Sequence, residues 1–225
     1  MAKILCLETA TTNCSVALSE NGKVLAFRED NNKGYSHAER LHLFIEEVLQ
    51  ESKITFQELD AIAVSKGPGS YTGLRIGVSS AKGLCYSLGI PLISIPTLQL
   101  LALQINQPTQ FIIPLLDARK NGGICLDVFD AEMNEIRQTK AEILEETSFS
   151  EYLQKGIVSF IGSGAEKWKG LCTSPQAVFV ENAYPSALQM VSLADEKYKK
   201  SDIEDVAYFE PYYLKDFLIK APRKA

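Results

Sequence analysis

The stretch with the richest chemistry is residues 65–77, which reads S-K-G-P-G-S-Y-T-G-L-R-I-G. It follows the apolar run 61–64, typical of a buried parallel strand, and precedes a helix-length segment, 74–88. Gly67 and Gly69 therefore lie in a strand-to-helix turn, where free N–H groups at the helix N-terminus can bind a phosphate or a carboxylate. A tight turn that only packs strand against helix explains the same glycines, and on shape alone we favour it. The order of residues matches neither a Walker A loop nor a nucleophile elbow.

Serine and histidine side chains offer little support for catalysis or metal binding. Ser70 has no identifiable base near it in the sequence, so a structural or capping role is favoured over a nucleophile. Thr72 is the predicted N-cap of the following helix. His37 and His42 are five residues apart and do not share a helix face, and two ligands fall short of a metal site. We expect His37 to be solvated, and we predict no catalytic residue and no metal.

Composition limits the classes of protein that fit. The 225 residues carry a net charge of −5. This charge argues against a protein that binds nucleic acid by itself, because phosphate contacts need Lys and Arg. No apolar run reaches the length of a membrane span, and the N-terminal apolar run is too short for a secretory signal. The 5 cysteines are scattered without a C-x-x-C pair and read as reduced core thiols. These features predict a cytoplasmic globular protein with no membrane contact.

The first half of the chain begins with three predicted strands, and helices follow them. The strands are 3–7, 14–19 and 23–28, and Asn21-Gly22 between the last two is a strong hairpin signal. Ser36 and Glu39 form a capping box before a helix over 36–52. A second helix over 74–88 carries small residues on one side, and their cost in helix stability indicates close approach of another backbone. That backbone is either the chain's own sheet or a partner helix.

The second half repeats the first in outline. The polar stretch 106–110 predicts a boundary between two domains, 1–106 and 107–225. Strands at 111–116, 124–129 and 135–141 follow, then strands at 157–161 and 177–180 and helices near 166–171 and 185–199. A pattern of strand, acid, turn, strand, turn, strand and helix that occurs twice is typical of a duplicated ribonuclease-H-like fold. We therefore predict an α/β protein with two mixed sheets flanked by helices.

Three stretches of the first half resemble the bacterial TsaB family. They are the string G-P-G-S-Y-T-G-L-R-I-G, the A-K-G-L after it and the strand P-L-I-S-I at 91–95. The resemblance implies two domains of the actin, hexokinase and Hsp70 superfamily. It implies a non-catalytic subunit that binds and activates the TsaD transferase in tRNA threonylcarbamoyladenosine synthesis, with the ATPase TsaE in the same complex. Transfer RNA would be met through the complex, and ATP and metal would sit on the partners, so this chain would have no cofactor of its own.

The resemblance also implies that the first two helices, 36–52 and 73–88, form the contact with TsaD, and with a second copy of the chain when TsaD is absent. The interface residues expected there are small or apolar: Leu41, Phe44, Ile45, Val48, Gly73, Gly77, Ser80 and Ala81. The substitution Gly77→Leu should then block association and leave the monomer folded. Unfolding would mean that the small-residue side faces the core.

The superfamily places the ends of the first strands of the two domains at a common cleft. Glu8, Asp117, Gly67, Gly69 and Ser70 are therefore candidates for a vestigial phosphate site. No glycine directly follows either acid, which disfavours close approach of a phosphate. A free-standing ATP-dependent enzyme and a peptidase of the same fold remain alternatives, the first predicting an activity that Asp117→Ala abolishes.

Two further motifs bear on the family comparison. The His-x-x-x-His pair of TsaD corresponds to Thr97 and Leu101, and neither side chain replaces imidazole as a ligand. Near the end, F-E-P-Y-Y-L-K at 209–215 resembles the family's closing pattern, with Lys215 where Arg is commoner. The basic tail residues Lys220, Arg223 and Lys224 are expected to be a solvated end or a weak contact with tRNA or a partner.

Overall fold

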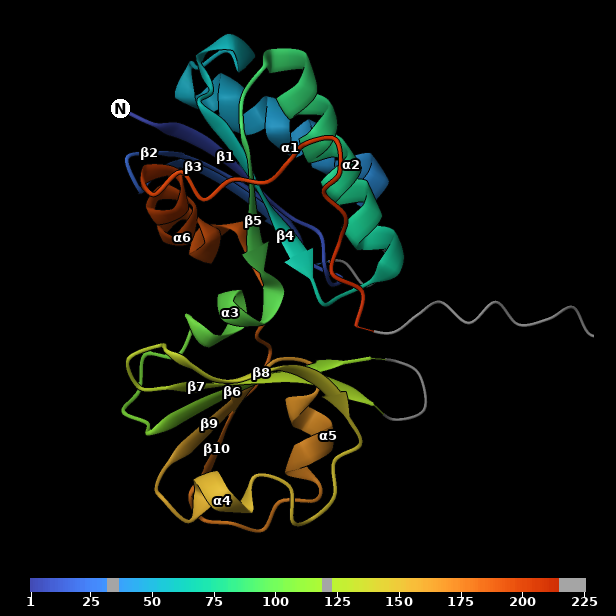
Figure 1. Ribbon diagram of the computed structural model, residues 1–225, viewed down its shortest axis with the longest axis vertical. Helices are drawn as coiled ribbons and strands as arrows, with labels where there is room; N and C mark the ends of the chain where they lie inside the picture. Colours follow the sequence, from blue (N-terminus) through green and yellow to red (C-terminus); the bar gives the residue numbers. More distant parts are fainter. Residues whose placement is uncertain (32–36, 119–122, 215–225) are drawn as a thin grey trace, which may run out of the picture.

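The computed structural model describes residues 1–31, 37–118 and 123–214, and they form two α/β units, one above the other (Figure 1). Each unit is built on a five-stranded sheet. The first sheet has the order β3 (Lys23–Asp30), β2 (Cys14–Glu20), β1 (Lys3–Glu8), β4 (Ala61–Gly67) and β5 (Leu92–Pro96). The second has the order β8 (Glu135–Glu142), β7 (Ile124–Asp130), β6 (Phe111–Asp117), β9 (Val158–Ile161) and β10 (Ala177–Val180).

The two sheets have the same topology. In each, the first three strands of the unit pair antiparallel, and the fourth joins the first strand in parallel. The fifth strand then extends that parallel edge. The predicted duplicated ribonuclease-H-like fold with mixed sheets is confirmed.

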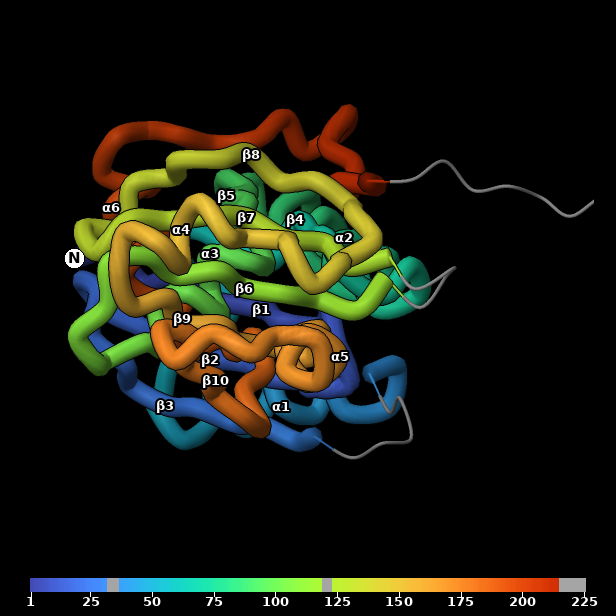
Figure 2. Tube along the Cα trace, turned by 90° about the horizontal axis from the view of Figure 1, so that it is seen from below, coloured from blue at the N-terminus to red at the C-terminus, as the bar shows by residue number. Residues whose placement is uncertain are grey.

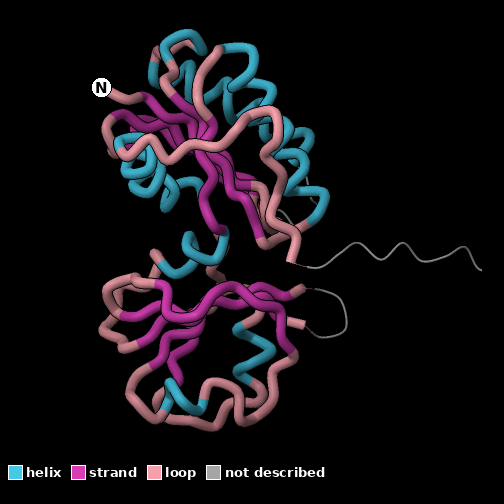
Figure 3. The backbone as a smooth tube through the Cα atoms, viewed as in Figure 1, coloured by secondary structure: helices cyan, strands magenta, loops and turns pink. Residues whose placement is uncertain are grey.

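Helices cover both faces of each sheet, as the cyan segments of Figure 3 show. In chain order the helices are α1 (His37–Ser52), the short 3₁₀ helix η1 (Phe56–Glu58), α2 (Tyr71–Leu88), α3 (Thr97–Ala102), α4 (Ser150–Leu153), α5 (Ala165–Lys169) and α6 (Ala187–Lys199). Helices α1 and α2 pack on one face of the first sheet and α6 on the other. Helices α4 and α5 lie on the outer face of the second sheet, and α3 packs on its inner face.

The last helix of each unit therefore crosses to the other sheet. Helix α3 follows β5, but Leu98 and Leu101 pack against Ile112 and Phe129 of the second sheet. Helix α6 follows β10, but Met190 packs on the first sheet. This exchange ties the two units together through apolar contacts on both sides of the connection.

The predicted domain range 107–225 needs correction for this reason. The segment from α6 to residue 214 belongs to the first unit, because α6 buries its apolar face on β1, β2 and β5. The chain then runs back along β5, where the Glu204 N–H donates to the Leu92 carbonyl, and reaches the end of β4, where the Tyr212 N–H donates to the Lys66 carbonyl. Seen from below, this final segment and β8 lie on the same side of the molecule (Figure 2).

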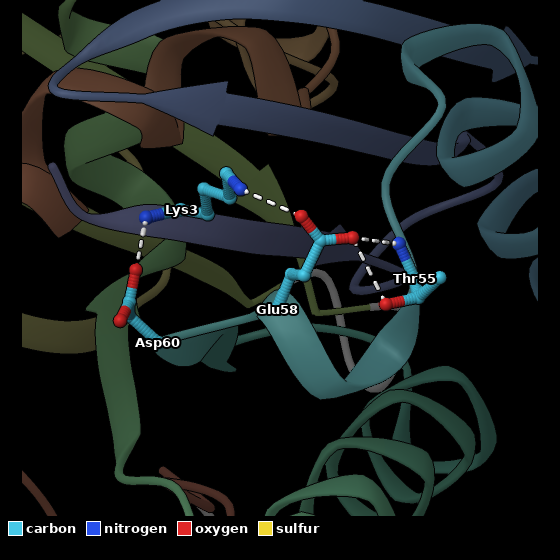
Figure 4. Close-up of polar contacts among 4 residues, drawn as sticks. All are labelled: Lys3, Thr55, Glu58 and Asp60. Atoms are coloured by element: carbon cyan, nitrogen blue, oxygen red, sulfur yellow. Dashed lines mark hydrogen bonds and ion pairs between the residues drawn. The ribbon is translucent and has the colours of Figure 1, made fainter.

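A small polar cluster fixes the start of β1 (Figure 4). The Lys3 N–H donates to the Asp60 carboxylate at 2.7 Å, and the Lys3 ammonium lies 3.1 Å from Glu58 Oε1. The other Glu58 oxygen accepts from the Thr55 N–H and hydroxyl, both at 2.9 Å. The Thr55 backbone bond and the Lys3 charge lower the pKa of Glu58 to about 2. The loop before β4 is thereby held beside β1, its parallel neighbour.

Local expectations were met with small shifts in the bounds. Asn21 and Gly22 both have positive φ, as the predicted hairpin turn requires. Helix α2 begins at Tyr71, three residues before the predicted start. Helix α4 was not predicted. Ser36, half of the predicted capping box, lies outside the described residues, as do Lys215, Lys220, Arg223 and Lys224.

Candidate functional site at the glycine-rich turn

The turn between β4 and α2 is closed by the chain's own backbone. Ser70 caps α2, since its hydroxyl accepts from the Gly73 N–H at 3.3 Å, so the capping role predicted for Ser70 is confirmed and Thr72 is not the cap. The Ser70 N–H donates to the Ala10 carbonyl at 2.6 Å. One of the N–H groups expected to bind an anion is therefore used to hold the loop after β1.

The glycines of the turn and of α2 make room for the same loop. A Cβ on Gly69 would lie 2.5 Å from the Ala10 carbonyl oxygen. A Cβ on Gly73 would overlap the Thr9 carbonyl oxygen, and one on Gly77 would overlap the Thr9 hydroxyl. That hydroxyl donates to the Gly73 carbonyl at 2.8 Å, so Thr9 is held against α2. The sequence indicated that another backbone approaches the small residues of α2. That backbone belongs to the chain itself, in the loop after β1.

This geometry places most of the residues expected at the partner interface inside the first unit. All of them except Ser80 are buried in the first unit: Leu41, Phe44, Ile45, Val48, Gly73, Gly77 and Ala81. The apolar stripe of α1 packs on the sheet, because the sheet is the largest apolar surface beside it. Gly73 and Gly77 of α2 face the loop after β1. Ser80 is partly exposed and lies 3.4 Å from the His42 ring, at the contact between the two helices.

Glu8 is fully buried at the end of β1. Its Oε1 accepts from the Ala10 N–H at 2.5 Å and from the Ser65 hydroxyl at 3.0 Å, while Oε2 has no hydrogen-bond partner. Burial raises the pKa of Glu8 to about 7, against the opposing effect of these two hydrogen bonds. The carboxyl group is thus integrated into the β1–β4 contact.

Asp117 occupies the corresponding place in the second unit but has different surroundings. It is half-buried, and its carboxylate lies 2.9 Å from the Lys167 ammonium of α5. Its own N–H donates to the Ser163 hydroxyl at 3.2 Å. The acid is therefore paired within its own unit.

The remaining candidates also have structural surroundings. His37 is buried, contrary to the expectation that it is solvated, and its Nε2 lies 2.7 Å from the Thr11 carbonyl oxygen; burial lowers its pKa. Thr97 and Leu101 are fully buried in α3. Within residues 1–31, 37–118 and 123–214, no group of three His, Cys, Asp or Glu side chains is arranged to hold a metal. In the same ranges no helix is both long and apolar enough to cross a membrane.

A cavity of about 670 Å³ lies where the two units meet. The first unit contributes the end of β4 with Gly67, the start of α3 and Tyr212, and the second contributes β7 and β8. Gly67 has a φ of 109°, and a Cβ there would lie 2.7 Å from the Tyr212 carbonyl oxygen, so the glycine allows the final segment to pass close to β4. Sequence reasoning missed this cavity because its lining comes from four separated stretches.

Comparisons with known proteins agree with the sequence resemblance. The family profile of TsaD, tRNA N6-adenosine threonylcarbamoyltransferase, matches residues 33–221. The chain is 28% identical over 224 residues to the tRNA threonylcarbamoyladenosine biosynthesis protein TsaB of Haemophilus influenzae, covering 95% of this chain and 93% of that protein. The Escherichia coli protein of the same name is 29% identical, with 95% of each chain covered. A Bacillus thuringiensis tRNA N6-adenosine threonylcarbamoyltransferase is 33% identical over 53% of this chain and 39% of its own length.

Solved structures support the same architecture. A Pseudomonas aeruginosa protein described as similar to peptidase YeaZ superimposes with a TM-score of 0.85 at 24% identity, covering 96% of this chain and all of that one. A second structure, described as YeaZ from Pseudomonas aeruginosa, superimposes with a TM-score of 0.84. At this identity the likeness supports the fold alone.

Proposed function

This chain belongs to the TsaD family of tRNA N6-adenosine threonylcarbamoyltransferases and resembles TsaB over almost its whole length, and from this premise we propose that it is a non-catalytic subunit of tRNA threonylcarbamoyladenosine synthesis. In this role it binds and activates a TsaD-type transferase in the cytoplasm. A TsaE-type ATPase joins the complex, and the complex as a whole binds tRNA. The partners bind ATP and metal.

The observation that carries this proposal is the filled turn after β4. In an enzyme that binds nucleotide here, the turn would leave its N–H groups and glycines free for phosphate. In this chain the Ser70 N–H and the faces of Gly69 and Gly73 are taken by the loop 9–10. Thr97 and Leu101, which correspond to the transferase's histidines, are fully buried, and this also supports a non-catalytic role.

The surface proposed for the partner is the outer side of α1 and α2. Tyr86 is 86% exposed and Leu43 is 51% exposed, both on these helices. Gly83 is also exposed, and a Cβ added to it would have nothing within 4 Å, so a partner helix can approach α2 closely there. The same surface serves a homodimer when the transferase is absent.

The role is tested by reconstituting the modification. A TsaD-type transferase, the ATPase, the threonylcarbamoyl-adenylate synthase, ATP, threonine, bicarbonate and unmodified tRNA are combined with and without this chain. Mass spectrometry of the nucleosides should find the product only when the chain is added. Equal product without it would refute the proposal and return attention to the alternatives of an ATP-dependent enzyme or a peptidase.

The surface is tested with two substitutions and a matched control. Gly83→Leu and Tyr86→Ala should each weaken transferase binding by more than tenfold, about 1.4 kcal/mol, in a pull-down or calorimetric titration. Ile143 is 70% exposed and directly follows β8 in the second unit, so Ile143→Ala should bind normally. Equal binding by all three variants would contradict the assignment of α1 and α2.

A further inference from the structure

The cavity between the two units contains a buried carboxylate that the proposed function does not use. Asp127 of β7 lines the cavity and is only 2% exposed. Its Oδ1 has no hydrogen-bond partner, while the Thr139 side chain hydrogen-bonds the carboxylate. A buried carboxylate oxygen without a donor is costly, so a donor supplied from outside the chain would stabilise this carboxylate.

Strand alternation explains why Asp127 faces the cavity. Ile124, Leu126 and Val128 belong to the core beneath α4 and α5. Cys125 and Phe129 belong to the cluster under α3, on the opposite face of β7. Asp127 stands between them on this inner face, where a strand of the same pattern would carry a third apolar side chain.

A bulge in β8 brings two more polar side chains to the same place. Leu126 pairs with Lys140, and Val128 pairs with Arg137, so Gln138 and Thr139 together oppose the single residue Asp127. A bulge of this kind re-aims side chains, and both Gln138 and Thr139 line the cavity. The irregularity of the strand therefore builds a polar pocket around the carboxylate.

We propose that this cavity binds a small molecule that carries a primary ammonium group, and that the ammonium pairs with the carboxylate of Asp127. The cavity volume is in the range of small-molecule sites. The lining contains the carboxylates of Asp127 and Glu135 against one ammonium, that of Lys66, so its formal charge favours a cation. Gln99 and Gln138 supply amide groups for the rest of the ligand.

The charge of Asp127 makes binding depend on pH. Burial raises the pKa of Asp127 to about 6, with a smaller contribution from the negative charge of Glu135. Lys66 of β4 and Tyr212 of the final segment are the other titratable groups that line the cavity, and α3 contributes the uncharged Gln99. An ammonium ligand prefers the ionised carboxylate, so its affinity should increase as the pH rises through about 6.

Two probes separate the sources of such a ligand. Putrescine carries only ammonium groups, and L-serine carries an ammonium and a carboxylate. The full chain is titrated with each at pH 8 and at pH 5, and the backbone amide shifts of residues 127, 138 and 139 are followed by NMR. We expect saturable binding of at least one probe at pH 8 and about tenfold weaker binding at pH 5. If the natural ligand is an amino acid, Lys66→Met should weaken binding of L-serine and leave the binding of putrescine equal or stronger, because the variant removes a positive charge from the lining.

The carboxylate is tested by Asp127→Asn, which keeps the shape and removes the charge. Binding should become at least tenfold weaker, while Glu132→Gln, the same loss of charge in the turn between β7 and β8 but outside the cavity lining, should leave it unchanged. The comparison of pH 8 with pH 5 needs no variant and applies even if Asp127→Asn does not fold. Absence of saturable binding of both probes up to about 10 mM, or equal binding by Asp127→Asn, would overturn the proposal and leave a buried water as the partner of Oδ1.

Discussion

The strand-to-helix turn of the first unit and that of the second are built alike. The first links β4 to α2 and the second links β9 to α5. Each begins with a glycine in the left-handed region, Gly67 with φ 109° and Gly162 with φ 100°. In each, an N–H of the turn donates to a carbonyl within two residues of the end of the unit's first strand, that of Ala10 at 2.6 Å in the first unit and that of Leu115 at 2.8 Å in the second. The duplication of the fold thus extends to the hydrogen bond that closes the turn.

The two turns lead into helices of different length and packing. Helix α2 has 18 residues and continues the contact through Gly73 and Gly77, which enclose Thr9. Helix α5 has 5 residues and makes no such contact in the part of the chain that is described. The acid of the first unit, Glu8, is fully buried, while Asp117 of the second is partly exposed and ion-paired. The glycine-rich string therefore reflects how tightly a long helix packs against the loop after β1.

The largest effect is expected for Gly77→Leu. The added side chain meets Thr9, which cannot move away because its hydroxyl is bonded to the Gly73 carbonyl. Overpacking at a site this rigid should cost more than about 3 kcal/mol, a large part of the stability of a domain. Urea unfolding followed by circular dichroism measures the loss.

Gly83 of the same helix provides the control for Gly77. A Cβ there meets nothing within 4 Å, so Gly83→Leu should leave the protein folded and, by its higher helix propensity, stabilise it by up to about 1 kcal/mol. If Gly77→Leu were as stable as Gly83→Leu, α2 would not be packed on Thr9, and a partner contact through Gly77 would again be the better explanation.

Glu8→Gln should change the pH dependence of stability. Because the folded pKa of Glu8 is about 7 and the unfolded value is 4.5, its contribution is fully present below pH 4.5 and is lost as the pH rises through 7. At about 1.4 kcal/mol per pKa unit, the loss across this window is on the order of 3 kcal/mol. Gln keeps an acceptor for the Ala10 N–H and the Ser65 hydroxyl, and it does not ionise.

The measurement for Glu8 is the free energy of unfolding at several pH values for both proteins. The decrease between pH 4.5 and 7 should be smaller in the variant by the contribution of this one group. Parallel curves would contradict a buried, titrating carboxyl at the end of β1.

A milder effect is expected in the second turn for Gly164→Ala. Its Cβ would lie 2.9 Å from Leu115 Cβ and from Ile124 Cγ2, whereas a Cβ on Gly69 in the first turn would lie closer, 2.5 Å from a backbone oxygen. We expect a loss of about 1–2 kcal/mol, measured by thermal unfolding beside Gly69→Ala. A larger loss for Gly164→Ala than for Gly69→Ala would mean that the second turn is the more tightly packed of the two.

Sequence patterns predicted the elements because each is specified locally. Alternation and apolar runs placed the strands, and Asn21-Gly22 placed the hairpin, since these signals act within a few residues. The two first-strand acids were also found, because each ends an apolar run. The order of strand, acid and turn occurs twice in the chain, and this repetition was enough to predict the duplicated topology.

The direction of a helix face could not be predicted in the same way. Gly73 and Gly77 are equally compatible with a partner helix and with the chain's own Thr9, and only the folded chain shows that Thr9 fills the space. The crossing of α3 and α6 to the opposite sheets was missed for the same reason, because helical periodicity shows that a face is apolar and not which sheet it covers. Long-range contacts decide these points.

The smallest effect is expected for Asp117→Asn, the counterpart of the Glu8 substitution. The Asp117–Lys167 pair is partly exposed, so its loss should cost less than about 1 kcal/mol, and this cost should shrink in high salt. Urea unfolding at low and high salt, with Lys167→Met in a double-mutant cycle, measures it. In the reconstituted modification the variant should support full product formation, because the proposed role does not use this carboxylate. A variant that stays folded but no longer supports the modification would make Asp117 a functional acid, and the two ends of the duplicated fold would then differ in chemistry as well as in packing.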